Sequence, residues 1–144
     1  MAKTIDMQVM RYINLFERIS RVSTTNCFVY NNTIYFAVPK SKVMVAVGKN
    51  GENVKQLSDV LRRKIRIVAQ PSENMDKVLA LKKFIGDVVS PVEFTSLEMN
   101  SDGILVLSGE REAKAMLIGR DRSKEKELAE VLEMNFGVKE FKII

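Results

Sequence analysis

Histidine and tryptophan are absent from the 144-residue sequence, and cysteine occurs once. Histidine is the commonest general base and a frequent metal ligand, so its absence argues against acid–base catalysis. A single thiol and no imidazole also leave too few ligands for a zinc site. We therefore predict a protein that is not an enzyme, with no catalytic residue, no metal and no cofactor.

The lone Cys27 cannot form an internal disulfide, which fits a reducing compartment. It lies in an apolar stretch without a basic neighbour, so we interpret it as a small buried hydrophobe. No apolar run approaches the roughly 20 residues that span a bilayer, and the N-terminus has no secretory h-region. The expectation is a cytoplasmic protein that does not bind membranes, and a monomer.

Charge is unevenly distributed along the chain. Residues 1–72 contain 12 basic and 4 acidic side chains, a net +8, whereas residues 73–144 contain 11 and 14, a net −3. A polyanion should therefore bind the first half more readily than the second.

Hydrophobic periodicity in the first half predicts the order α-β-β-α-α-β. Asn31-Asn32 suits a tight hairpin turn between two strands, and Ser41 is a plausible N-cap of the second helix. In the third helix Val54, Leu57, Val60 and Leu61 should form the buried face. The expected helices cover residues 4–21, 41–47 and 52–62, and the expected strands cover residues 27–30, 33–38 and 64–69.

The second half repeats this order. Gly137 suits the C-cap of its last helix. The expected helices cover residues 74–89, 110–118 and 123–136, and the expected strands cover residues 91–99, 104–107 and 138–144. An offset of 71 residues places Gly48 on Gly119, and it also aligns the apolar face of the following helix, Leu57 with Leu128, Val60 with Val131 and Leu61 with Leu132. We interpret the chain as two tandem copies of one fold, residues 1–72 and 73–144.

A turn bounded by two glycines, Gly48-Lys49-Asn50-Gly51, separates the two later helices of the first copy. Glycine accepts positive φ and places no side chain between the backbone and a ligand. Amides at a helix start attract anions, and Lys49 and Lys55 add formal positive charge. The turn is thus a candidate site for a nucleic-acid backbone, although an ordinary helical corner with a solvated lysine remains the alternative. It is not a P-loop, which needs four residues between its glycines.

The corresponding turn of the second copy reads Gly119-Arg120-Asp121-Arg122. Arg122 places a Cβ where a phosphate would approach, and Asp121 repels phosphate. We expect the classical clamp to be lost there, with the two arginines still able to contact a backbone from the side. Residues 123–127 mix charge signs and should form a solvated helix face.

The glycine turn in its α-β-β-α-α-β context resembles the G-x-x-G loop of a type II KH domain, which holds single-stranded nucleotides. The resemblance implies an α+β fold (α/β in the broad sense) with two KH domains, each built on a three-stranded mixed sheet. The intact loop belongs to residues 1–72 and the degenerate one to residues 73–144.

Two KH copies in succession resemble the KH region of the NusA family of transcription elongation and termination factors, in its short archaeal form. The resemblance implies binding to nascent single-stranded RNA, with RNA polymerase as a candidate partner. Further basic residues, Lys64 and Arg66 among them, would contribute to the surrounding field. The implied RNA-binding residues are Val47, Gly48, Lys49, Asn50, Gly51, Asn53, Val54, Lys55, Lys40, Lys42, Arg62, Arg63, Gly119, Arg120 and Arg122.

Two other functions stay open at this point. One is a ribosomal-RNA-binding assembly or processing factor with the same loop chemistry. The other is a protein-interaction adaptor whose acidic second half docks a basic partner.

Overall fold

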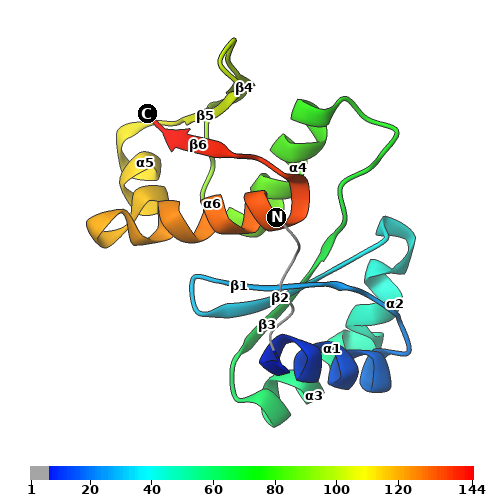
Figure 1. Cartoon of the computed structure of the whole chain (residues 1–144). Coiled ribbons are helices and arrows are strands. Elements are labelled where there is room, and N and C mark those ends of the chain that lie inside the picture. Colours follow the sequence, from blue (N-terminus) through cyan, green and yellow to red (C-terminus); the bar gives the residue numbers. More distant parts are fainter. Residues whose placement is uncertain (1–6) are drawn as a thin grey trace. The chain divides into compact units, whose positions relative to one another are not determined.

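The computed structural model of the chain describes residues 7–144. Thr4, Ile5 and Asp6, which the sequence analysis placed in the first helix, lie outside the described residues. The chain divides into two compact units at residues 70 and 71, close to the expected joint at residues 72 and 73. Each unit contains one three-stranded sheet (Figure 1).

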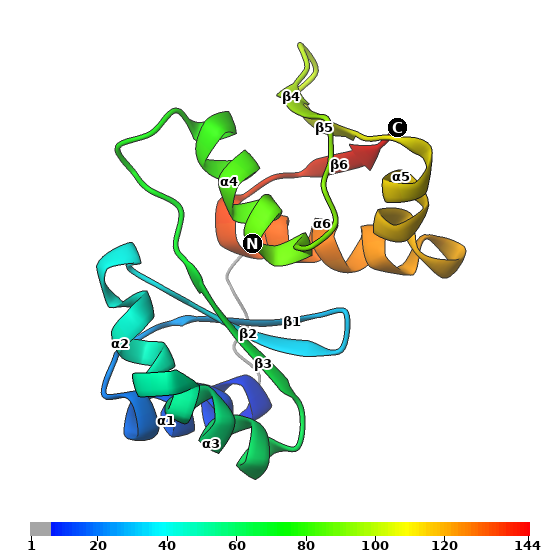
Figure 2. The same ribbon diagram turned by 180° about the vertical axis from the view of Figure 1, so that it is seen from behind.

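The first unit follows the predicted element order. Its helices are α1 (Met7–Ser20), α2 (Val43–Val47) and α3 (Glu52–Leu61), and its strands are β1 (Asn26–Tyr30), β2 (Thr33–Val38) and β3 (Lys64–Ala69). The central strand β2 pairs antiparallel with β1 and parallel with β3, which gives a mixed sheet. Seen from behind, α1, α2 and α3 lie along the same face of that sheet (Figure 2).

Strand alternation decides which side chains of β2 meet the helices. Ile34, Phe36 and Val38 point into the core, where the Phe36 ring stacks on Phe16 of α1 at a centroid distance of 4.3 Å. Tyr35 points to the other face and stacks on Phe28. Successive side chains of β2 therefore pack on opposite faces of the sheet, and all six are buried because β2 is the central strand.

The hairpin turn between β1 and β2 has the conformation that the sequence predicted. Asn31 and Asn32 both have positive φ, 49° and 58°, and Tyr30 pairs with Thr33 directly across the turn. Two left-handed central residues match the right-handed twist of the flanking strands. Cys27, in β1, is buried and not disulfide-bonded, as expected.

The second unit has the same order. Its helices are α4 (Lys77–Val89), α5 (Arg111–Ile118) and α6 (Ser123–Phe136), and its strands are β4 (Ser96–Met99), β5 (Ile104–Ser108) and β6 (Glu140–Ile143). Strand β5 pairs antiparallel with β4 and parallel with β6. Leu105 and Leu107 of β5 are fully buried with Leu128 and Leu132 of α6. The predicted α+β fold with two three-stranded mixed sheets is confirmed.

Several predicted boundaries and caps are wrong. Ser41 caps no helix, since it lies inside the 3₁₀ turn Lys40–Lys42 and α2 begins only at Val43. Helix α4 begins three residues later than predicted, where the Asp76 carboxylate accepts a hydrogen bond from the Leu79 amide. The strand expected from Pro91 begins at Ser96. In each case a polar or proline-containing stretch was assigned to the neighbouring regular element.

Two side chains differ from their predicted burial. Val60, assigned to the buried face of α3, is 57% exposed, whereas Leu57 is fully buried. Glu125, assigned to a solvated face of α6, is only 8% exposed. Helical periodicity predicts which side of a helix faces the core. How many residues on that side are buried depends on tertiary packing.

Candidate nucleic-acid interface

The glycine turn joins the end of α2 to the start of α3. Gly48 has φ 85° and ψ 167°, a conformation that is essentially restricted to glycine. Asn50 (φ 56°, ψ 27°) and Gly51 (φ 73°, ψ 19°) are left-handed. Positive φ at both glycines confirms the conformational reason for the motif.

The turn is closed by its own backbone and by one side chain. The Gly51 amide donates to the Gly48 carbonyl at 3.1 Å, and the Glu52 amide donates to the Lys49 carbonyl. The Asn53 side-chain amide donates to the carbonyls of Val45 and Ala46, at 3.3 and 3.1 Å. Asn53, predicted to bind RNA, is therefore committed to holding α2 against α3.

The two glycines do different work. A Cβ built on Gly48 would lie 2.9 Å from the Asn53 side chain and 3.0 Å from its backbone nitrogen. A Cβ on Gly51 would meet nothing within 4 Å. Gly48 is thus required by the fold, whereas the space beside Gly51 is open to a ligand.

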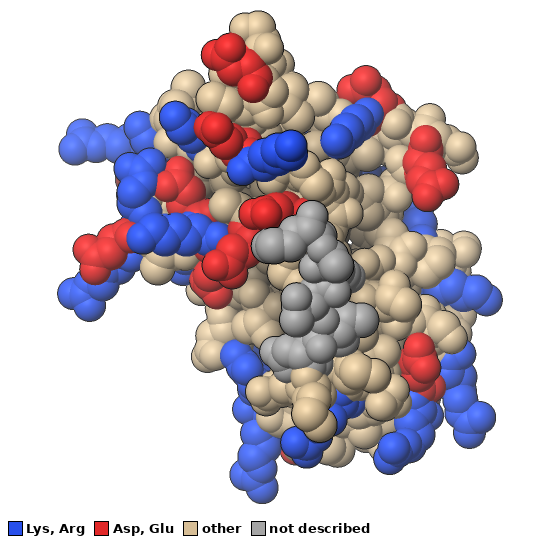
Figure 3. Space-filling view, in the orientation of Figure 1, with Lys and Arg blue, Asp and Glu red and all other residues tan. Residues whose placement is uncertain are grey.

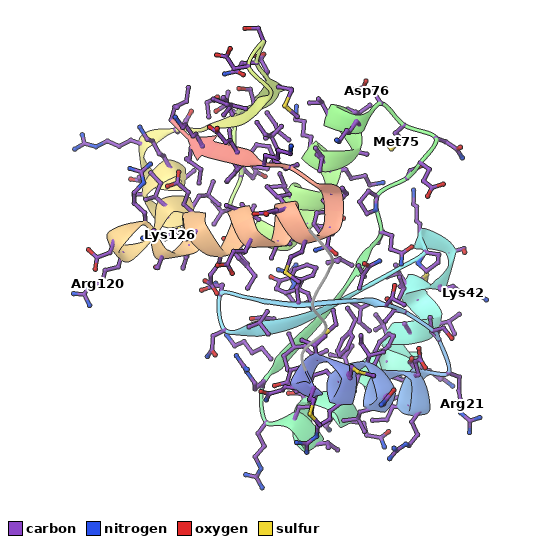
Figure 4. All side chains as sticks on the ribbon, viewed as in Figure 1. Arg21, Lys42, Met75, Asp76, Arg120 and Lys126 are labelled. Atoms are coloured by element: carbon purple, nitrogen blue, oxygen red, sulfur yellow. The ribbon has the colours of Figure 1, made fainter. Side chains whose placement is uncertain are left out.

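Exposed lysines precede, occupy and follow the turn along the chain. Lys40, Lys42, Lys49 and Lys55 are exposed, and Figure 4 shows Lys42 pointing away from the unit beside α2. Lysines and arginines dominate the charged surface over α1 and α2, while both signs mix over α5 and α6 (Figure 3).

The exposed apolar surface next to the turn differs in part from expectation. Val47 and Val54, both predicted to bind RNA, are half-buried. The more exposed apolar side chains are Met44 and Val45, at 85% and 56%. Both lie on the single turn of helix before Gly48. Neither residue was among the predicted RNA-binding residues, because apolar character in a short helix does not reveal which side chains stay exposed.

The remaining arginines lie elsewhere. Arg62 and Arg63 follow the last residue of α3, a full helix length of about 15 Å from the glycine turn. Arg63 donates to the Asn32 side chain at 2.9 Å, at the β1–β2 turn. Arg66 lies over the Tyr35 ring at 5.6 Å and donates to its hydroxyl. Burial raises the pKa of Tyr35, and Arg66 opposes that rise. The structure does not bring these arginines to the turn.

The second turn keeps the backbone of the first. Gly119 (φ 72°, ψ 179°), Asp121 (φ 53°, ψ 31°) and Arg122 (φ 61°, ψ 23°) match their counterparts to within 13° in every angle. The expected loss therefore concerns side-chain chemistry and not the conformation of the turn. Arg120 points outward from the tip of this turn (Figure 4).

Arg122 is turned away from the tip by an ion pair. Its Nε and Nη2 donate to the two oxygens of Glu125 at 2.6 and 3.1 Å. One of these oxygens also accepts from the Ile143 amide of β6 at 2.9 Å. The pair fastens the second turn to the end of the sheet, so Arg122 is held by a carboxylate that the sequence analysis treated as solvated.

Acid should loosen this fastening. Hydrogen bonding from Arg122 holds the pKa of Glu125 below its ordinary value, burial opposes that shift, and the Ile143 amide adds to it. A lowered folded-state pKa stabilises the fold above the unfolded value of about 4.3, and the gain is lost as the pH falls through the lower folded pKa. We therefore expect the free energy of unfolding to decrease less steeply below about pH 5 in Glu125→Gln than in the wild type.

Hydrogen exchange at the Ile143 amide gives a local readout of that change. Its protection should fall with acid in the wild type and be lower and less pH-dependent in Glu125→Gln. Glu130→Gln, at an exposed site on the same helix, is the matched control. The prediction would be contradicted if the protection of the Ile143 amide changed with pH in the same way in Glu125→Gln and the wild type.

Two features are missing from residues 7–144, a cluster of metal-ligating side chains and a membrane-spanning helix. Among these residues no group of three or more potential ligating side chains converges. Over the same residues no helix has the length and apolar character of a membrane span.

Comparison with known proteins adds three findings. A family model of the KH domain matches residues 10–88. A probable transcription termination protein NusA of Halococcus morrhuae is 23% identical over 99% of both chains. The protein of the same name from Methanococcus vannielii is 26% identical over 94% of this chain and 76% of its own length.

A solved structure supports the same relationship. The crystal structure of APE1850 superposes on 97% of this chain with a TM-score of 0.69, and 26% of the aligned residues are identical. The match covers 100% of that protein. The resemblance to archaeal NusA proteins that was drawn from the glycine turn and the duplication is therefore confirmed over nearly the whole chain.

Proposed function

The chain belongs to the KH domain family, and from that premise we propose that it binds single-stranded RNA and acts as a transcription elongation or termination factor. The observation that carries the proposal is the glycine turn, with exposed Lys49 and Lys55 beside it. Two archaeal relatives are named as probable transcription termination proteins, and this supports the second part.

The turn would hold the sugar–phosphate backbone. The amides of Gly51 and Glu52 are bonded within the turn, so we assign the backbone contact to the tip, at Lys49 and Asn50. The partial positive charge at the start of α3 and the Lys49 ammonium both favour a phosphate there. Gly51 leaves room for the strand to pass.

Bases would lie against the apolar surface next to the turn. Met44 and Val45 supply exposed aliphatic area, and half-buried Val47 and Val54 continue it. Single strands are read by contact with unstacked bases, whereas a duplex hides its base faces. We therefore expect a preference for single-stranded over double-stranded RNA.

The second unit would contribute less. Its turn has the right backbone, but Asp121 is negative and Arg122 is paired with Glu125. Arg120 remains exposed at its tip and would provide a peripheral phosphate contact. We propose that the first turn clamps the RNA and that the second acts as a weaker basic contact.

The salt dependence of RNA affinity tests the proposal. Lys49→Ala and Lys55→Ala should each weaken binding of short single-stranded RNAs and lower the slope of log K against log salt by about 0.7. The measurement is fluorescence anisotropy over a salt series, with a duplex RNA as comparison. Lys83→Ala, exposed on α4, is the control and should keep the wild-type slope.

Slopes that do not change in the Lys49 and Lys55 variants would place the RNA elsewhere. Absence of RNA binding would favour the adaptor alternative. Co-purification with RNA polymerase or with ribosomal particles then distinguishes transcription from ribosome assembly.

A further inference from the structure

The first unit has a groove between α1 and α3 that the proposed RNA site does not use. It has a volume of about 490 Å³. Leu15, Val60 and Leu61 provide its apolar surface, and Arg11 and Arg18 line it from α1. None of the described residues that line it is acidic. Val60, the residue whose exposure was not predicted, is 57% exposed here.

The second unit shows that the fold does not require such an opening. Val131, which corresponds to Val60, is 4% exposed. Helix α6 continues to Phe136, whose ring packs edge-on against Phe84 of α4 at 5.0 Å between centroids. Helix α3 ends at Leu61 and supplies no counterpart of Phe136. Val60 is thus exposed in the first unit, whereas its counterpart Val131 is buried in the second.

The charges on the groove indicate its occupant. Arg11 and Arg18 are exposed and lie seven residues apart, two turns or about 10.5 Å along α1. The ion pair found among residues 7–144, Arg122–Glu125, lies in the other unit, so neither arginine has a carboxylate partner in the described chain. Carboxylates two turns apart on a helix would match the two guanidinium groups.

We propose that this groove binds an acidic amphipathic helix of a partner protein. Its apolar side chains would cover Leu15, Val60 and Leu61, and its carboxylates would pair with Arg11 and Arg18. This is the helix-in-groove mode of recognition, in which apolar anchors give affinity and flanking charges give orientation.

The groove suits a protein better than RNA. Its apolar surface is aliphatic, and the one aromatic residue in its wall, Tyr12, is only 7% exposed. The Tyr12 hydroxyl accepts a hydrogen bond from Gln8, which further fixes the ring. No ring face is therefore open for base stacking, the usual source of single-strand affinity outside a clamp. The groove also lies at the opposite end of α3 from the glycine turn.

The test uses the full chain and two synthetic helical peptides. Both peptides carry leucines on one helix face. Beside that face, the acidic peptide carries two glutamates two turns apart, and the basic peptide carries two lysines at the same positions. In NMR titrations the acidic peptide should shift the resonances of Leu15, Val60 and Leu61 and bind at least about tenfold more tightly than the basic one, a difference of about 1.4 kcal/mol.

Charge reversal supplies the matched variants. The double variant Arg11→Glu/Arg18→Glu should lose at least about tenfold in affinity for the acidic peptide. Lys82→Glu/Lys83→Glu, at exposed positions on α4, should bind it as the wild type does. Circular dichroism confirms folding, and RNA affinity through the glycine turn should be intact in the wild type with the peptide bound.

Each other outcome overturns the proposal. Equal affinity for the acidic and basic peptides would mean apolar association only, and no binding of either would leave the groove without this role. A loss of RNA affinity in the Arg11/Arg18 variant without peptide binding would make the groove an extension of the RNA surface. Concentration-dependent shifts without peptide would assign it to a second copy of the chain.

Discussion

Replacing Gly51 with aspartate should lower the affinity for single-stranded RNA by about tenfold to a hundredfold, or about 1.4 to 2.8 kcal/mol. The variant should fold, because a Cβ at this position meets nothing within 4 Å and aspartate tolerates the left-handed conformation. The loss would come from a carboxylate placed at the proposed phosphate site. Anisotropy titration measures it, and the same variant should lose the effect of the wild type on pausing or termination in a purified transcription reaction.

Two controls separate charge from shape. Gly51→Asn adds nearly the same side chain without the charge, so it should lose much less affinity than Gly51→Asp. Asp121→Asn, at the left-handed tip of the second turn, should change affinity little. Wild-type affinity in Gly51→Asp would show that RNA does not bind at the first turn. A large change in Asp121→Asn would show that the second turn is the stronger contact.

The opening glycine should matter for folding and not only for RNA. We expect Gly48→Ala to destabilise the first unit by about 2–4 kcal/mol. The backbone conformation is nearly exclusive to glycine, and the new Cβ would press on Asn53, whose amide holds two α2 carbonyls. Unfolding by urea, followed together with hydrogen exchange of the β2 amides, measures the change.

Gly51→Ala is the matched comparison, and it should cost only about 1–2 kcal/mol because its strain is left-handed φ alone. Gly119→Ala should cost about as much as Gly48→Ala, because Gly119 has the same backbone conformation and a Cβ there would lie 2.8 Å from Lys124 Cγ and 3.2 Å from its backbone nitrogen. Equal losses at Gly48 and Gly51 would contradict the separate roles assigned to the two glycines. The same distinction explains why the second turn keeps Gly119 but accepts Arg122.

Much of the fold could be predicted because its signals are local. Apolar residues with helical spacing, β-branched runs and the Asn31-Asn32 pair each favour one backbone conformation over a few residues. The 71-residue offset then required the second half to share the order of the first. The errors at Ser41 and before Ser96 occurred where polar or proline-containing segments carry no period.

The candidate site could be predicted only in part. The position of the turn and the positive φ of its glycines follow from residue type. The role of Asn53 in holding α2 against α3 could not be predicted, because its hydrogen-bond acceptors are backbone carbonyls, which every sequence has. Nor could the burial of Glu125, since the amide that binds it belongs to Ile143, 18 residues later.

By itself, then, the sequence determined the duplication, the order of elements, the glycine turn and the basic character of the first half. These depend on residue type and spacing, which are complete within a short stretch of chain. Tertiary structure alone decided that Arg63 is bonded to Asn32, that Arg122 is held by Glu125, and that Val60 is exposed while Val131 is buried. Those outcomes depend on which residues from distant parts of the sequence pack around a side chain, and the periodicity of the sequence does not predict those neighbours.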